Sequence, residues 1–536
     1  MRRPPENWIN WKPVMAMSDM KIASNKKIVV LLLILVGVVY ANSLFSGFVW
    51  DDNLLILSKQ AFFSHPENAL KILSLPDAPL GGKFPYYRPL NTLTYMLDHY
   101  LWGLHPFWYH LENILLHGLA VVLFYLLLME VFEDGRLAFL AAVIFALYPV
   151  NTEAVDVISN RNTLFCAVFS IASLLFLFKG GAEWTILSLL SYFLALLSKE
   201  PAVVLPFFLF SFGLTAGEHK FKIKKKKVLI GFFAVTGIYF LIRRLVLGAF
   251  TSATGVEFSI PRLKLMASVY FEHFKLMFFP FRLNALYTEK PFSFNMIKGI
   301  VAITGVLLLF YFSLKKKTPA PVRAGAQWLF WGLLLVSNLV KIPSAPVAER
   351  FQYTFLFGFA VILGYLLSGL QKRRALAGSA VAAVLALVLG ARTFARNFVW
   401  HDDLSLYSSM VRSDPKDVLA LYDLGVACER RGDLYNAARE FSAALDVEPG
   451  DIEARVELGV VDAETGHLEE AVQEFRTALA IDPGYVKAMV NLGVAYAKEG
   501  RIKEAAAEFQ NALYLDPGNT PAHEYLDKIK QFSGVR

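Results

Sequence analysis

Long apolar runs without a charge constrain this chain more than any other feature of its sequence. Residues 28–47 and 375–391 are two of these runs, and roughly 17–25 apolar residues make a helix that crosses a bilayer. Of the 536 residues, 56% are hydrophobic and only 18% are charged, which is too little charge for the surface of a soluble protein of this length. The sequence therefore predicts a polytopic membrane protein, and it excludes disordered, collagen-like and disulfide-rich secreted classes.

Eleven runs are predicted to be membrane-spanning helices. They cover residues 28–47, 110–131, 137–150, 162–178, 184–198, 201–216, 228–247, 297–314, 325–341, 351–370 and 375–391. Several are short and have a proline near an end, which is typical of helices that break beside a buried cavity. The segment 263–280 is predicted to be an interfacial helix, with a further membrane crossing as the alternative.

Clusters of cations set the predicted orientation. They comprise Lys21, Lys26 and Lys27, then residues 219–227, 315–317 and 372–374. With eleven spans all of them fall on one side, which the positive-inside rule makes cytoplasmic. We therefore predict a cytoplasmic segment at 1–27, outer loops at 48–109 and 249–296, and a first span retained as an anchor. The net charge of +8 suits lipid headgroups better than nucleic acid, because the cations lie between apolar runs.

The end of the sequence repeats itself every 34 residues. Residues 411–536 hold 14 Lys and Arg against 23 Asp and Glu, a net charge of −9, whereas residues 1–410 carry +17. The recurring positions include Leu424, Leu458 and Leu492; Gly425, Gly459 and Gly493; Phe441, Phe475 and Phe509; and Pro449, Pro483 and Pro517. This period is typical of tetratricopeptide repeats (TPRs). We predict a linker with half a repeat at 392–417, then three TPRs and a capping helix at 418–536, forming a protein- or peptide-binding concave surface.

Charged residues gather on the predicted outer face, and charges against a membrane are functional candidates by default. Asp51 and Asp52 are adjacent carboxylates, a pattern that suits general-base work or cation binding; a solvated loop start or a helix N-cap would also explain it. The other candidates are Trp50, Arg88, His110, Glu112, Glu153, Arg161, Lys199, Glu200, Glu349 and Arg350. Neighbours such as Glu349 and Arg350 could be plain salt bridges. Together, however, carboxylates beside cations suit a lipid-linked phosphate that carries a group to be transferred.

His110, Asn113 and His117 share one face of a predicted helix. Their spacing matches no sharp metal motif, so hydrogen bonding is favoured over a metal site.

Residues 40–52, YANSLFSGFVWDD, resemble the first-loop signature of the transmembrane and tetratricopeptide-repeat-containing O-mannosyltransferases and their prokaryotic relatives. Further matching motifs lie at 87–90, 102–106, 110–113, 149–155 with Arg161, 198–200 and 348–351. Asn151 departs from the family pattern, which has His there, and Asn162 stands where Ala or Ser is commoner. The motifs occur in order over the whole chain, repeats included.

The resemblance implies a C-type glycosyltransferase (GT-C) fold over residues 28–391, using a polyprenyl-phosphate sugar, mannose or another hexose. Asp51 or Asp52 would then be the general base for a Ser or Thr hydroxyl of an acceptor protein. Arg88, Arg161, Lys199 or Arg350 would stabilise the leaving phosphate, and direct displacement would invert the anomeric centre. Trp50, His110, Glu112, Glu153, Glu200 and Glu349 would support the site. A divalent ion could replace part of the cationic clamp, although nothing in the sequence requires one.

Two other functions stay open at this stage. The body could be a catalytically inactive or glycan-directed scaffold for envelope assembly, with the repeats docking a partner protein. A transporter fits less well, because the charges gather on one face instead of at the membrane midplane. In each case we expect an integral protein of a prokaryotic inner or plasma membrane, with the repeats outside the cytoplasm.

Overall fold

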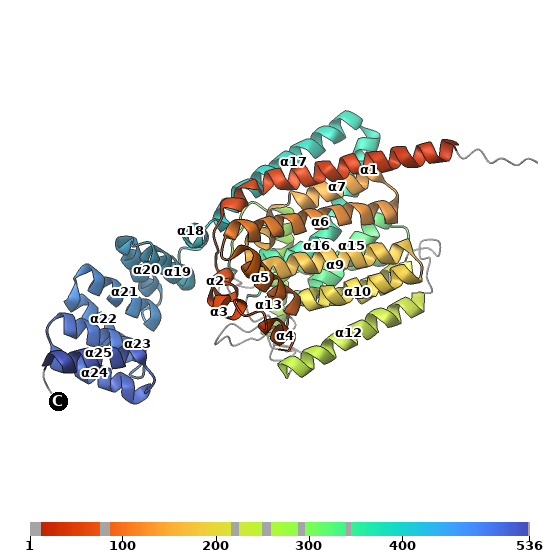
Figure 1. The fold of residues 1–536 in the computed structure, drawn as a ribbon. Coiled ribbons are helices and arrows are strands. Elements are labelled where there is room, and N and C mark those ends of the chain that lie inside the picture. Colours follow the sequence, from red (N-terminus) through yellow and green to blue (C-terminus); the bar gives the residue numbers. More distant parts are fainter. Residues whose placement is uncertain are drawn as a thin grey trace, which may run out of the picture. The chain divides into compact units, whose positions relative to one another are not determined.

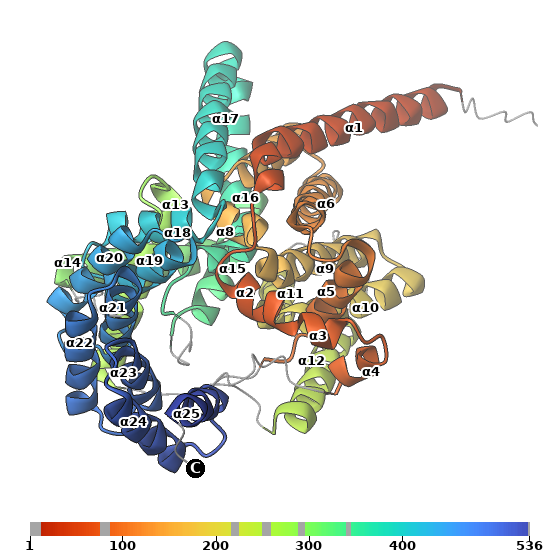
Figure 2. The same cartoon turned by 60° about the vertical axis from the view of Figure 1, so that its left-hand side comes forward.

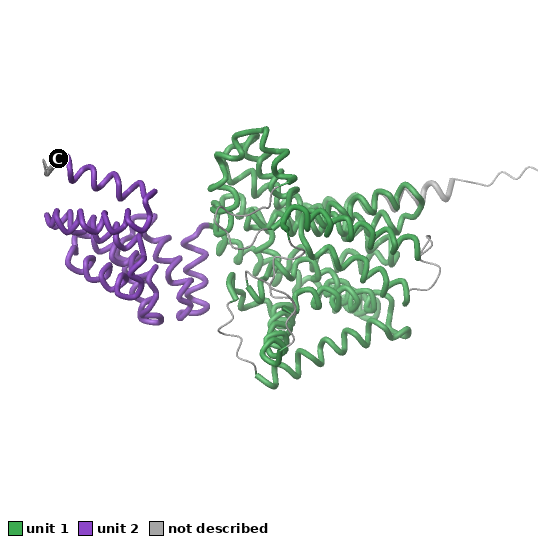
Figure 3. Tube along the Cα trace, turned by 90° about the horizontal axis from the view of Figure 1, so that it is seen from below, with its two compact units in different colours: residues 1–401 green, residues 402–536 purple. Residues whose placement is uncertain are grey.

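The computed structural model of the chain describes residues 12–74, 86–215, 225–248, 259–287, 295–338 and 345–533. It divides into two compact units, residues 1–401 and 402–536 (Figure 3). Within the described ranges the regular structure is helical, and an isolated antiparallel bridge joins Tyr287 to Val347. The predicted all-α fold class is confirmed.

Each of the eleven predicted spans overlaps a helix of the first unit, although several bounds differ, as for 28–47 against a helix that ends at Val39 (Figures 1 and 2). These helices are α1 (Lys12–Val39), α6 (Pro106–Phe132), α7 (Gly135–Ala146), α9 (Arg161–Lys179), α10 (Ala182–Ser198), α11 (Val204–Thr215), α12 (Lys225–Leu247), α14 (Met296–Leu314), α15 (Ala320–Leu335), α16 (Glu349–Arg373) and α17 (Ala375–Asn397). Six helices in the described ranges are long and apolar enough to cross a membrane. A seventh span would be formed by α7 together with the segment Pro149–Asp156, which is bent by 52° relative to it. The count of eleven stays a prediction, because helices such as α10 and α11 are shorter.

Some of the predicted features lie outside the described residues. They are parts of the 1–27 segment, of both outer loops and of the cationic run 219–227, and the span ends at 216 and 339–341.

The bundle has a buried centre and an apolar outside. The apolar stretch that includes α9 is 78% buried, and those of α6 and α16 are 56% buried, whereas those of α14 and α17 are only 17% and 11% buried. The peripheral helices expose large apolar side chains such as Ile300, Leu307 and Leu387. A soluble monomer does not expose contiguous apolar surface on this scale. The first unit is therefore a membrane domain, as the sequence indicated.

The polar motifs lie where helices of the bundle begin or end. α7 leads into η3 (Pro149–Asn151), α8 (Thr152–Asp156) and η4 (Ile158–Asn160), and α10 leads into η5 (Glu200–Val203). These turns, the start of α16 and the end of α17 lie at one end of the bundle, called the site end below (Figure 1). Lys315 and Lys372 lie at the opposite ends of α14 and α16, where Lys372 Nζ bonds to Asp134 at 2.7 Å. These cationic residues thus lie at the end of the bundle away from the site end, as the predicted placement of the cationic clusters on one side requires.

The first loop folds over the site end in short helices. They are η1 (Ala41–Phe45), α2 (Asp51–Leu55), η2 (Leu57–Lys59), α3 (Gln60–Phe63), α4 (Asn68–Ile72) and α5 (Pro89–Trp102). The segment predicted to be interfacial is helix α13 (Ile260–Phe278), which contacts α14 and α16. Its position in the membrane stays a prediction.

The second unit is a stack of helix pairs. It comprises α18 (Asp403–Ser413), α19 (Val418–Arg430), α20 (Leu434–Val447), α21 (Ile452–Thr465), α22 (Leu468–Ile481), α23 (Val486–Lys498), α24 (Ile502–Leu515) and α25 (Thr520–Ser533). Three pairs followed by α25 match the predicted repeats and capping helix, and α18 is the expected extra helix. An added Cβ on Gly459 would lie 2.7 Å from the ring of Phe475, so the recurring Gly and Phe interlock within each pair.

Gly459→Val should destabilise the second unit, because its side chain would overlap the fully buried Phe475 ring. Overpacking of this kind costs about 1–3 kcal/mol. Gly450→Val is the matched control, since no atom lies within 4 Å of an added Cβ there. Hydrogen exchange of amides in α21 and α22, followed in the intact chain, should speed up for Gly459→Val only. Equal exchange in both variants would contradict the interlocking.

Candidate active site

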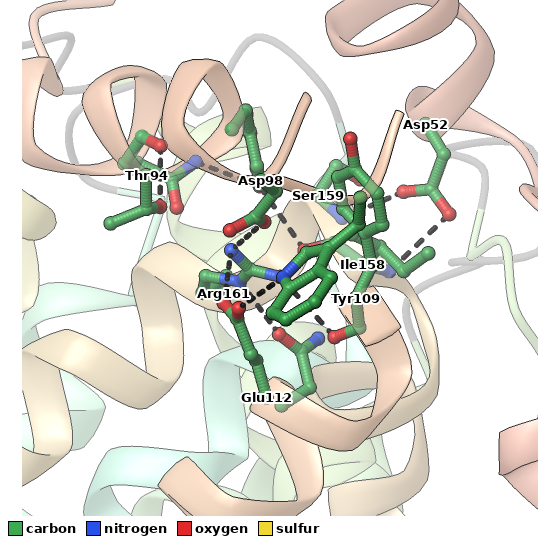
Figure 4. Close-up of polar contacts among 12 residues, drawn as sticks. Asp52, Thr94, Asp98, Tyr109, Glu112, Ile158, Ser159 and Arg161 are labelled. Atoms are coloured by element: carbon green, nitrogen blue, oxygen red, sulfur yellow. Dashed lines mark hydrogen bonds and ion pairs between the residues drawn. The ribbon is translucent and has the colours of Figure 1, made fainter. Parts of the chain in front are cut away.

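The structure gives the two adjacent aspartates different surroundings. Asp52 is fully buried, and its carboxylate accepts hydrogen bonds from the backbone N–H of Ser159 at 2.6 Å, Val49 at 3.1 Å and Ile158 at 3.3 Å (Figure 4). Asp51 begins α2 and is half-buried. Asp52 therefore fastens the first loop to η4, and Asp51 is the more accessible of the two carboxylates.

Burial raises the pKa of Asp52 to about 7, although the three backbone N–H groups act in the opposite direction. A buried carboxylate is tolerated only where hydrogen bonds replace its hydration. The aspartate thus serves as an acceptor for backbone groups that would otherwise be unpaired. Asp52 is not an N-cap, because the N-cap residue of α2 is Trp50, and the predicted role of Asp52 in proton transfer stays a prediction.

Arg161, the first residue of α9, is enclosed by partners on two helices, α5 and α6. It is fully buried and bonds to the carboxylate of Asp98, while Glu112 lies 3.1 Å from it (Figure 4). Its Nε donates to Asn113 Oδ1 at 2.9 Å, and Nη2 donates to the carbonyl of Tyr109 at 3.2 Å. Protein acceptors therefore engage all three guanidinium nitrogens, and Arg161 joins α5, α6 and α9.

Glu153 and Arg350 form a pair between distant segments. Glu153 on α8 is fully buried, and it accepts the backbone N–H of Arg350 at 2.6 Å as well as a bond from the guanidinium. Asp51 is close enough to act on that guanidinium electrostatically. Arg350 is thus held at the start of α16 by a carboxylate 197 positions earlier in the chain.

Glu349 pairs away from its neighbour Arg350. It is buried, and its Oε1 accepts from Arg396 Nη2 at 3.2 Å and from the Tyr287 hydroxyl at 3.3 Å. The alternative of a Glu349–Arg350 neighbour bridge is therefore wrong, because successive residues at the start of α16 point in different directions.

The Lys199–Glu200 pair behaves in the same way. Glu200 binds two arginines, Arg88 Nη2 at 3.0 Å and Arg243 Nη1 at 2.9 Å. Lys199 is buried, and its Nζ donates to Thr163 Oγ1 at 2.6 Å. Burial, together with the charges of Arg88 and Arg350, lowers the pKa of Lys199 to about 7. Lys199 therefore contributes to a cluster of cations with Arg88 and Arg350.

A cavity opens beside this cationic cluster. Lys199, Arg350 and Thr163 supply polar groups to its wall, and most of the remaining wall is apolar. It holds about 580 Å³ of unoccupied space, counting the part open to solvent. A second cavity, of about 530 Å³ when the part open to solvent is counted, is lined by apolar side chains and glycines, and Trp328 and Phe357 form part of both walls. A cationic pocket thus borders an apolar one inside the bundle.

The histidines are used in hydrogen bonds. His110 Nε2 lies 3.2 Å from the Gly47 carbonyl, and His117 Nδ1 lies 2.7 Å from the Tyr353 hydroxyl. No group of three or more His, Cys, Asp or Glu side chains within the described ranges is arranged to hold a metal ion.

Several partners escaped the sequence analysis. They are Thr163, Arg243, Tyr287, Arg396 and Trp400. Arg243 carried a usable signal, because it is a charge inside the predicted span 228–247. The others depend on how helices pack, and their spacing in the chain does not reveal it.

Comparisons with known proteins identify the second unit. TPR family models match residues 404–452, 435–486 and 463–528. The Arabidopsis OM64 TPR domain is similar over 22% of this chain and 95% of that chain, with 24% identity and a TM-score of 0.21. The TPR family models and the apolar helices of the first unit together define the class of protein, a membrane bundle joined to TPRs.

Similar proteins are named protein O-mannosyl-transferases. TMTC3 of Mus musculus is 36% identical over 191 residues, which cover 33% of this chain and 20% of that protein. F38B6.6 of Caenorhabditis elegans is 25% identical over 421 residues, 76% of this chain and 60% of the relative. The matches span about a fifth of the TMTC3 sequence and three fifths of the worm protein. The resemblance to the transmembrane and TPR-containing O-mannosyltransferases is confirmed.

Asp52→Asn should destabilise the first loop. One oxygen would become an NH₂ group facing backbone N–H donors, and a buried donor without an acceptor costs about 1–3 kcal/mol. Asp51→Asn is the matched control and should leave stability unchanged, because Asp51 is half-buried and caps no backbone donor in the described hydrogen bonds. Thermal unfolding of the purified protein in detergent compares the two. Equal melting temperatures would show that Asp52 is not an anchor.

Proposed function

We propose that the chain is a membrane glycosyltransferase that moves a hexose, mannose by analogy with its relatives, from a polyprenyl phosphate to a Ser or Thr hydroxyl of a protein. One observation carries this proposal. The cations Lys199 and Arg350 line a cavity that shares two aromatic walls with an apolar cavity. A ligand with an anionic head and a long hydrocarbon tail fits such a pair, and polyprenyl phosphates have this chemistry.

The proposed base is Asp51. Its carboxylate is only half-buried and is close enough to interact electrostatically with the Arg350 guanidinium. The Asp52 carboxylate, in contrast, already accepts hydrogen bonds from backbone N–H groups. The Asp51 carboxylate takes the proton of the acceptor hydroxyl, and the oxygen attacks the anomeric carbon of the sugar. The bond from that carbon to the phosphate oxygen breaks, and polyprenyl phosphate leaves with the electron pair. Attack opposite the leaving group inverts the anomeric centre.

The proposed phosphate clamp is Lys199 with Arg350. Both line the cavity, and charge-assisted hydrogen bonds from them would stabilise the charge that develops on the leaving phosphate. Arg88 adds to the local positive potential but is also bound to Glu200. Arg161 is assigned a structural role, because its nitrogens already have protein partners.

The repeats are proposed to bind the acceptor or a partner protein and to take no part in the chemistry. They follow α17, which ends at the site end, so with cytoplasmic cations the repeats and Asp51 would both face the outside. A divalent ion is not required by this mechanism.

Asp51→Asn should abolish sugar transfer without unfolding the protein. Loss of a general base is commonly worth about 10²–10⁴-fold in rate, and Asn keeps the size of the side chain. Transfer of radiolabelled mannose from polyprenyl phosphate to a Ser/Thr peptide measures the effect. Glu67→Gln, which removes an exposed carboxylate from the same loop, should retain full activity. Full activity of Asp51→Asn beside an active wild type would exclude Asp51 as the base.

Donor binding should weaken as the pH rises through about 7. The pKa of Lys199 lies near that value instead of 10.5, so its positive charge is present below pH 7 and is lost above it. Lys199→Arg keeps the charge throughout and should remove this dependence. The KM for the donor, measured between pH 6 and 8.5, tests it. The same pH dependence in Lys199→Arg would assign it to another group.

A further inference from the structure

A strained turn lies immediately before the proposed base. Trp50 has φ 52° and ψ −118°, the conformation of the second residue of a type II′ turn, where glycine is usual. The backbone N–H of Asp52 donates to the Val49 carbonyl at 2.9 Å and closes this turn. A bulky side chain there is strained, and such strain persists only where the surroundings hold it in place.

The surroundings of Trp50 are another tryptophan and a cation. Its ring stacks on that of Trp400, with ring centres 6.2 Å apart and planes inclined by 11°. The Arg350 guanidinium lies 5.6 Å from the Trp50 ring centre, over the ring. Offset aromatic stacking and cation–π attraction both favour this arrangement. The ring of Trp50 thus contacts one of the two proposed phosphate-binding cations.

Trp400 is itself firmly held. It is fully buried, and its Nε1 donates to Thr152 Oγ1 at 3.2 Å, beside Glu153. The Arg396 guanidinium lies over its ring at 5.5 Å and also bonds to Glu349. The same segment binds the first loop directly, because Gly47 N–H donates to the carbonyl of His401 at 2.9 Å. Trp400 is therefore a rigid support for a turn that would otherwise relax.

From these contacts we infer that Trp400 is a positioning residue for the transfer reaction. It acts through the ring of Trp50, which fixes both the backbone that carries Asp51 and the guanidinium of Arg350. This inference rests on the proposed function. Without the stack, Trp50 leaves its strained conformation, and the spacing between base and phosphate clamp changes while the substrates still bind.

The test is a double-mutant cycle on kcat in the mannosyl-transfer assay. Trp400→Ala should lower kcat at least tenfold and change the acceptor KM less than twofold. Trp400→Phe keeps a stacking ring and should recover most of the rate. In the Asp51→Asn background, Trp400→Ala should cause a much smaller further loss, because the part of its effect that acts through Asp51 is gone and only the positioning of Arg350 remains. A merely structural residue would lower both backgrounds by the same factor.

Trp108→Ala is the matched control. Trp108 stacks on Trp102, with ring centres 4.6 Å apart, in the same loop region and outside the site. The kcat of this variant should equal that of the wild type. If Trp400→Ala fails to fold, Trp50→Ala provides a second test, because it removes the other ring of the same stack and Trp50 is only half-buried. Its kcat should fall by the same factor of at least ten. Wild-type kcat in a folded Trp50→Ala or Trp400→Ala protein would overturn the inference. Absence of transfer by the wild type would instead overturn the proposed function.

Discussion

The ion pair between Glu153 and Arg350 is the interaction on which the site end depends. Both groups are withdrawn from water inside a helical bundle, and a buried charge is tolerated only with a partner and further hydrogen bonds. Glu153 supplies both, since it binds the guanidinium and the backbone N–H of Arg350 at the start of α16. Removing one partner of such a pair typically costs about 3–5 kcal/mol. The pair also leaves Arg350 in the cavity wall, so the same contact that stabilises the fold presents a cation.

Pairing at long range extends from this contact to its neighbours. Glu200 joins Arg88 of the first loop to Arg243 of α12, and Glu349 joins α16 to Arg396 of α17. Each carboxylate therefore fastens segments that are far apart in the sequence. Lys199 is the exception among the predicted cations, because its described hydrogen bond goes to the neutral Thr163 hydroxyl. A cation placed in this way has the most to gain from an anionic ligand.

The sequence predicted the helices and the repeats because both produce local patterns in the sequence. Apolar runs locate the helices of the bundle, and a period of 34 residues locates the solenoid. It also identified most of the charged groups at the site end. It did not identify their partners: Asp98 and Arg161 are 63 positions apart, and only the packing of α5 against α9 brings them together.

The different roles of Asp51 and Asp52 were equally hidden. The two residues are identical in chemistry, and the direction of each side chain follows from the unusual backbone of Trp50. A positive φ at a tryptophan has no sequence signal, since such residues normally avoid that region. Salt bridges between the neighbouring charges at 199–200 and at 349–350 were an alternative for a related reason. They do not form, because adjacent side chains at the start of a helix diverge.

The interlocked Gly and Phe pairs of the second unit have a consequence for how such proteins diversify. In a solenoid each repeat contacts only the repeats beside it, so stability is nearly a sum of units and of the interfaces between neighbours. Gly425, Gly459 and Gly493 meet Phe441, Phe475 and Phe509 in the same way. Whole 34-residue units can therefore be gained or lost by recombination without disturbing the membrane bundle. Under the proposed function, acceptor range and reaction chemistry are then free to evolve separately.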